Sequence, residues 1–141
     1  MSHRCGSNCY RKRDMRSQCP SCARQAQKRR NTITAGGRER RLLQSVLENK
    51  HPEISKRDIS YVLGRWKIRG VWTDDQGRQS WNYYAMVPRL GRVVRVAVSL
   101  DDSLIVSVFI DRNATVRWRR RELSWFTNRL SRMEHRRLKW D

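Results

Sequence analysis

Four cysteines near the start of the chain have the spacing of a metal site. They follow the pattern C-x3-C-x9-C-x2-C and are Cys5, Cys9, Cys19 and Cys22. Two close pairs of thiolates can surround Zn²⁺ tetrahedrally, and zinc binding supplies folding energy to a segment with almost no aliphatic side chains. The sequence therefore predicts a structural zinc site. Two alternatives stay open, namely disulfides in an exported protein and cysteines without a shared role.

A second set of residues has the chemistry for cleaving RNA. Metal-independent cleavage needs a base for the 2′-hydroxyl, an acid for the leaving oxygen and cations for the phosphorane. Strand alternation puts four such side chains on one open face of an expected sheet: Lys67, Arg69, Tyr84 and Arg95. The candidate catalytic residues are Tyr84, Arg95, Lys67 and His51. We expect the cations to hold phosphate, Tyr84 to donate a proton or stack, and His51 to act as the base.

The same residues also have simpler interpretations. Cations on a sheet face can bind phosphate without cleaving it, or simply keep that face hydrated. Tyr84 belongs to the core if the strand has the opposite phase. His51 precedes Pro52 at an expected helix end, where a histidine is favoured by the helix dipole alone.

The composition points to a polyanionic partner. The chain of 141 residues has 32 Lys and Arg against 13 Asp and Glu, a net charge of +19. Arginine forks suit phosphates and guanine edges, so nucleic acid is the expected partner. The candidate contacts are Arg65, Arg69, Arg119, Arg120, Arg121, Lys28, Arg29 and Arg30. The alternative is that the charge serves solubility alone.

The sequence has no sign of a membrane or export segment. No apolar run reaches the roughly 18 residues that a membrane span requires. Residues 1–30 are polar and basic, without the apolar centre of a signal peptide. We therefore expect a cytoplasmic protein with no membrane partner.

The elements that must position these side chains can be placed by periodicity. Apolar residues at helical spacing predict helices over 38–49 and from Ser55 to Gly64, with Ser55 as N-cap. Four runs rich in Val, Ile, Trp and Tyr follow, separated by turn residues, at 65–72, 80–90, 93–100 and 104–111. A stripe at Leu123, Phe126, Leu130 and Met133 predicts one long helix over 117–140.

These elements add up to an α+β fold. We expect two short N-terminal helices, a four-stranded antiparallel meander and a long C-terminal helix, preceded by a small zinc-binding module. The helices should cover one face of the meander and leave the other open. The domains are then the cysteine-rich basic module at 1–30, a linker at 31–37 and the α+β domain at 38–141.

Residues 38–112 resemble a known family. The helix Ile54-Ser55-Lys56-Arg57-Asp58-Ile59-Ser60-Tyr61-Val62-Leu63 and the strand Leu104-Ile105-Val106-Ser107-Val108-Phe109 are similar to those of uncharacterised RelE-like toxin domains of the barnase–EndoU–colicin–RelE fold. The resemblance implies a metal-independent endoribonuclease that uses Arg, Lys and Tyr and acts on mRNA. It also implies the ribosome and an antitoxin as partners. The alternative is a non-catalytic, zinc-containing nucleic-acid or ribonucleoprotein-binding protein of phage or mobile-element origin.

Overall fold

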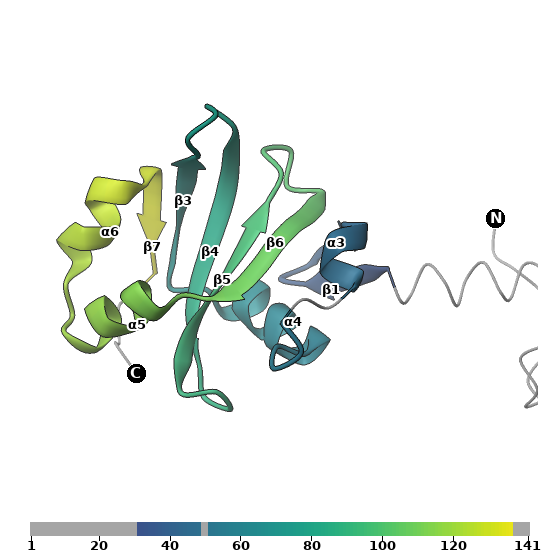
Figure 1. Ribbon diagram of the computed structural model, residues 1–141, viewed down its shortest axis with the longest axis horizontal. Helices are drawn as coiled ribbons and strands as arrows, with labels where there is room; N and C mark the ends of the chain where they lie inside the picture. Colours follow the sequence, from purple (N-terminus) through teal and green to yellow (C-terminus); the bar gives the residue numbers. More distant parts are fainter. Residues whose placement is uncertain (1–30, 49–50, 137–141) are drawn as a thin grey trace, which may run out of the picture. The chain divides into compact units, whose positions relative to one another are not determined.

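The centre of the molecule is a seven-stranded sheet. A computed structural model of the chain describes residues 31–48 and 51–136 (Figure 1), nearly all of them in one compact unit, Ile33–Asp141. The order across the sheet is β1-β2-β6-β5-β4-β3-β7. The strands are β1 (Thr32–Ala35), β2 (Arg38–Leu42), β3 (Ile68–Thr73), β4 (Gln79–Val87), β5 (Arg92–Val98), β6 (Leu104–Ile110) and β7 (Ser131–His135).

The expected four-stranded meander is therefore wrong as a description of the sheet. Strands β3 to β6 do pair antiparallel with their neighbours in chain order. However, β7 pairs with the outer edge of β3, and β2 runs parallel to β6 over Arg41↔Leu104 and Leu42↔Ile105. These two pairings join segments that are far apart in the sequence, which local patterning does not encode.

The N-terminal part of the domain is a hairpin and not a helix. Residues 38–49, expected to be helical, form β2 and only the short helix α3 (Gln44–Leu47). Residues 31–37, expected to be a linker, contain β1 and the turn Gly36-Gly37, whose φ angles are 59° and 76°. Glycine adopts such angles more readily than other residues, so the pair allows the tight reversal between β1 and β2.

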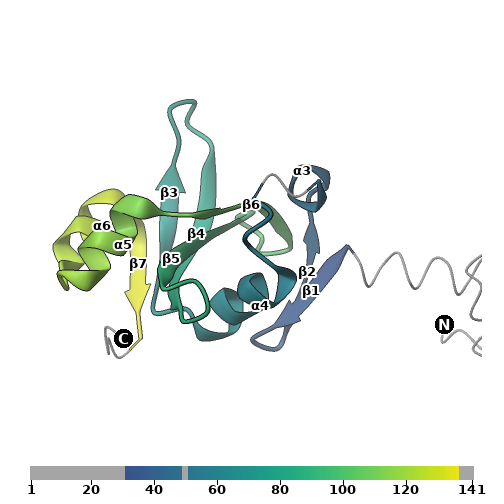
Figure 2. The same cartoon turned by 60° about the horizontal axis from the view of Figure 1, so that its bottom comes forward.

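Helix α4 (Lys56–Arg65) forms as the sequence predicts. Ser55 accepts a hydrogen bond from the Asp58 amide while the Asp58 carboxylate accepts one from the Ser55 amide, a reciprocal capping box. The buried stripe Ile59, Val62 and Leu63 packs on β4 and β5. Figure 2 shows α4 between these strands and the β1–β2 hairpin, so the sheet curls around the helix. We call this side of the sheet the α4 face.

An ionic contact holds the curl closed. The Asp102 carboxylate, in the turn between β5 and β6, accepts hydrogen bonds from Arg40 Nε and Nη2 at 2.9 and 3.1 Å. It also accepts one at 3.0 Å from the Tyr83 hydroxyl, and Arg38 lies 3.3 Å away. The Arg40 side chain is only 5% exposed. This Asp102 contact joins β2 to β4 across two intervening strands.

The C-terminal part is not one long helix. It consists of α5 (Arg112–Arg119), α6 (Leu123–Arg129) and β7, with Arg121 between the helices at a φ of 58°. The predicted apolar stripe is nevertheless used, because Leu123, Phe126, Leu130 and Met133 all contribute to one core. Residues three and four apart can share a side in a helix and also across a helix–strand junction, so the spacing did not reveal the break.

That core covers much of the face expected to be open. Ile68, Tyr84 and Val93 are buried there beneath Trp118 and Phe126. The sheet thus has a second covered side, which we call the α5–α6 face. In the described part of the chain, no helix combines the length and apolar character that crossing a membrane requires.

Candidate nucleic-acid interface

Tyr84, a predicted catalytic residue, lies inside the second core. Its side chain is 1% exposed, and its ring meets Phe126 edge-on with 5.4 Å between centroids. Burial raises the pKa of Tyr84, and the nearby Arg95 only partly opposes that effect. A hydroxyl held in this way cannot reach a bound RNA strand.

Arg95 is adjacent to Tyr84 but is packed between rings. The strand register pairs the two residues directly. The Arg95 guanidinium lies 4.8 Å from the Trp72 ring centroid and 4.1 Å from that of Phe109, and its Nη1 is 3.7 Å from Asp111 Oδ2. This arrangement joins β3, β5 and β6 on the α5–α6 face. It gives Arg95 a packing role and leaves only 9% of the residue exposed.

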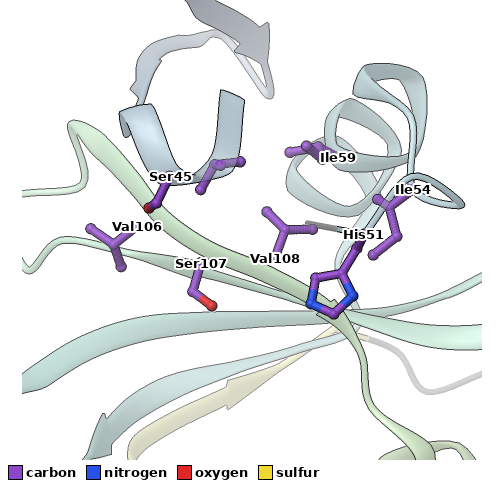
Figure 3. Close-up of a pocket in the computed structure, with 8 residues that line it drawn as sticks. Ser45, His51, Ile54, Ile59, Val106, Ser107 and Val108 are labelled. Atoms are coloured by element: carbon purple, nitrogen blue, oxygen red, sulfur yellow. The ribbon is translucent and has the colours of Figure 1, made fainter. Parts of the chain in front are cut away.

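Lys67 and His51 do not join the other two. Lys67 precedes β3, where its amide donates to the Tyr84 carbonyl. His51 lines a separate pocket of about 200 Å³ beside β6 (Figure 3), 3.7 Å from Glu53. The pocket is lined by Ser45, Val46, His51, Ile54, Ile59, Val106, Ser107 and Val108. The four predicted catalytic residues are thus brought together only as the pair Tyr84 and Arg95, away from solvent.

Arg69 lies on the opposite side of the sheet from the position expected for it. Its register partner is Tyr83, which faces α4, whereas Ile68 pairs with Tyr84 and faces α5 and α6. The prediction that Lys67, Arg69, Tyr84 and Arg95 share one open sheet face is therefore wrong. Strand alternation separates Ile68 from Arg69 correctly but does not say which face each one takes.

On the α4 face, Arg69 belongs to a group of stacked cations and aromatic rings. Its guanidinium carbon lies 4.5 Å from the Trp66 ring centroid, 5.6 Å from Trp81 and 5.8 Å from Tyr83. Arg136 lies 4.1 Å from the Trp66 centroid. We call Trp66, Arg69, Trp81 and Arg136 the arginine–tryptophan cluster.

Four different elements position this cluster. Trp66 ends α4, Arg69 lies in β3, Trp81 in β4, and Arg136 directly follows β7. Arg136 is held twice, since its amide donates to the Lys67 carbonyl at 2.9 Å and its guanidinium to the Gly64 carbonyl at 3.2 Å. The cluster therefore exists only when β7 lies beside β3.

Within the cluster, Arg69 is held in its charged form. Burial, the largest single effect, lowers the pKa of Arg69, but the hydrogen bond to Glu134 at 2.6 Å, together with the charge of Glu134 and the nearby Tyr83 hydroxyl, raises that pKa overall. The Arg69 side chain is 30% exposed and Arg136 is exposed, while Trp81 is half-buried. Trp66, only 8% exposed, forms the back of the cluster. Two guanidinium groups and part of an indole ring are therefore exposed to solvent.

The other predicted nucleic-acid contacts among the described residues lie near the ends of two helices. Arg65, at the end of α4, is exposed and lies 5.5 Å over the Tyr61 ring. Arg119, Arg120 and Arg121 are exposed near the end of α5, where Arg119 donates to the Gly91 carbonyl. Sequence reasoning identified these arginines, but it missed Trp66, Trp81 and Arg136. Because Arg136 and Trp66 are far apart in the chain, no sequence pattern indicated that they would be in contact.

The remaining predicted sites fall outside the described residues. Lys28, Arg29, Arg30 and the four cysteines Cys5, Cys9, Cys19 and Cys22 all lie in residues 1–30. Within residues 31–48 and 51–136, no three His, Cys, Asp or Glu side chains come together in a way that could hold a metal ion.

A comparison of the chain with protein families, with curated proteins and with solved structures finds no match.

Proposed function

We propose that this protein binds single-stranded nucleic acid, with RNA as the expected form, through the arginine–tryptophan cluster. The observation that carries the proposal is the packing of Arg69 among Trp66, Trp81 and Tyr83 on a partly exposed sheet face. Bases stack on indole rings and guanidinium planes, and arginine also pairs with phosphate. A net charge of +19 adds a long-range attraction for the same polymer.

Binding without cleavage fits the geometry better than a ribonuclease does. A RelE-like mechanism needs an acid and a base at the bound phosphate. Tyr84 is buried, Arg95 is packed between two rings, and His51 lines a pocket formed by other elements. The zinc module at Cys5, Cys9, Cys19 and Cys22 stays part of the proposal, as a second source of contacts to the strand.

Fluorescence anisotropy with a labelled single-stranded RNA tests the proposal. Trp81→Ala removes a stacking surface and should weaken binding by about 1–3 kcal/mol. Arg69→Gln should weaken binding and reduce the slope of log K against log salt by about 0.7. Arg57→Gln is the matched control, because Arg57 is exposed on the first turn of α4, outside the cluster.

Two further measurements make the outcome decisive. Circular dichroism must show that Arg69→Gln, which also breaks the pair with Glu134, stays folded. Gel electrophoresis of the same RNA, with and without EDTA, must show intact strands. If Trp81→Ala and Arg69→Gln bind as tightly as the Arg57 variant, the cluster is not the interface. Cleavage that survives EDTA would restore the ribonuclease hypothesis.

A further inference from the structure

A second basic feature lies on α5, away from the cluster. Residues three, four and seven apart share one side of a helix, so Arg112, Thr115, Val116 and Arg119 form one stripe. Together with Arg92, at the start of β5, they line a hollow of about 240 Å³. The stripe packs toward β5, and α5 belongs to the α5–α6 face of the sheet.

Hydrogen bonds fix the shape of this hollow. The Thr115 hydroxyl accepts from the Val93 amide at 3.0 Å and donates to the Asp111 carbonyl at 2.7 Å, which ties α5 to the start of β5. Arg119 Nη2 donates to the Gly91 carbonyl at 2.9 Å, in the turn that precedes Arg92. The Arg119 side chain is thus held across the hollow by a backbone contact.

Three arginines line this site, and none of its described lining residues is acidic. Among the residues that the structure describes, no carboxylate forms an ion pair with Arg92, Arg112 or Arg119. Nearby like charges repel each other, and the repulsion is relieved when an anion occupies the space between them. The Asp111 carboxylate cannot serve, because it caps α5 through the Ala114 amide and faces Arg95.

We propose that this hollow binds the terminal phosphate monoester of an RNA strand. A monoester carries a charge of about −1.5 to −2 at neutral pH and three acceptor oxygens, which suits three arginine forks. A backbone diester carries only one charge and two free acceptor oxygens, so it matches three arginine forks less well. Val116, 44% exposed, offers carbon surface to the terminal sugar. The proposal rests on the RNA binding proposed above and gives the strand an end-specific contact.

The test compares three RNAs of one sequence, carrying a 5′-phosphate, a 3′-phosphate or hydroxyls at both ends. One phosphorylated form should bind wild-type protein about tenfold more tightly than the hydroxyl form. Arg112→Gln should remove that difference and leave the affinity for the hydroxyl RNA nearly unchanged. Arg120→Gln, which removes the same charge outside the hollow, should keep the difference. The difference should also shrink below about pH 6, where the monoester gains a proton.

A second readout separates this proposal from the first. Titration with inorganic phosphate should shift the NMR signals of the Val116 methyl groups in wild-type protein and not in Arg112→Gln. If hydroxyl RNA fails to bind, the proposed function fails while the phosphate titration still decides the hollow. Equal affinity for all three RNAs, or equal phosphate shifts in both proteins, overturns the terminal-phosphate site. Tighter binding of a phosphoserine peptide than of phosphorylated RNA overturns the choice of ligand.

Discussion

Replacing Asp102 by asparagine should destabilise the fold more than any other single change at an exposed turn. Asp102 has a φ of 62°, in the left-handed region that asparagine tolerates well, so the substitution keeps the backbone. It removes the negative charge that faces Arg40, whose side chain is 5% exposed. The perturbation is therefore an uncompensated cation inside the curl of the sheet.

The magnitude follows from the contacts that are lost. The carboxylate accepts two hydrogen bonds from Arg40 and one from Tyr83, and an amide oxygen can keep only part of this set. Removing one partner of a buried ion pair costs about 3–5 kcal/mol. The Asp102 side chain is 19% exposed, and access of water reduces the cost, so we expect about 2–3 kcal/mol. The urea midpoint should fall by about 1–2 M.

Urea unfolding monitored by circular dichroism measures this loss. Asp75→Asn, at an exposed position in the turn between β3 and β4, is the control and should change stability by no more than about 0.5 kcal/mol. The double variant Arg40→Met with Asp102→Asn should recover stability relative to Asp102→Asn, because it removes the unpaired cation. A loss below about 1 kcal/mol for Asp102→Asn would refute the reasoning, since Arg40 would then be satisfied by water.

Three further predictions concern the core, the response to acid and the cysteines. Gly70→Ala should destabilise the fold by about 1–3 kcal/mol and lower the melting temperature. The reason is that a Cβ at this position would lie 2.8 Å from Leu130 Cβ and 3.1 Å from the Ser131 carbonyl oxygen. An unchanged melting temperature would show that β7 and Leu130 can move aside. Hydrogen bonding from Arg89 lowers the pKa of the buried Asp58 carboxyl. The ionised Asp58 therefore contributes fully to stability above the ordinary carboxyl pKa of about 3.9. That contribution is lost as the pH falls through the lower pKa of the folded state. Arg89→Gln should therefore move acid unfolding to higher pH in a circular dichroism titration, and an unmoved transition would contradict this link. The whole chain should bind about one zinc ion through Cys5, Cys9, Cys19 and Cys22, and a metal analysis that finds less than about half an equivalent would argue against the four-thiolate site.

Local signals predicted the elements whose contacts are local. The capping residues Ser55 and Asp58 lie three positions apart, and the helix they start is present as expected. The runs at 80–90 and 93–100, predicted from their β-branched and aromatic residues, form β4 and β5. Each of these inferences needs only the geometry of one helix or strand.

The errors come from contacts between distant segments. Residues 38–49 were expected to form a helix, yet Arg40 lies in β2 and is buried because it meets Asp102, 62 residues later. The sheet face of Arg69 depends on α5 and α6, which cover Ile68 and so turn Arg69 toward α4. The arginine–tryptophan cluster needs Arg136 beside Trp66, and no periodicity links residues so far apart. The sequence therefore indicated a basic surface but not where aromatic rings join it.

The position of β7 at the edge of the sheet has a consequence for how the protein becomes active during synthesis. Its partner strand β3 is made some sixty residues earlier, so β3 keeps an open edge while β4, β5, β6, α5 and α6 emerge. Glu134 and Arg136 reach Arg69 and Trp66 only when β7 closes that edge. A growing chain therefore lacks the finished cluster until almost all of the domain has left the ribosome. The nucleic-acid affinity that we propose for the cluster therefore depends on β7 being in place beside β3.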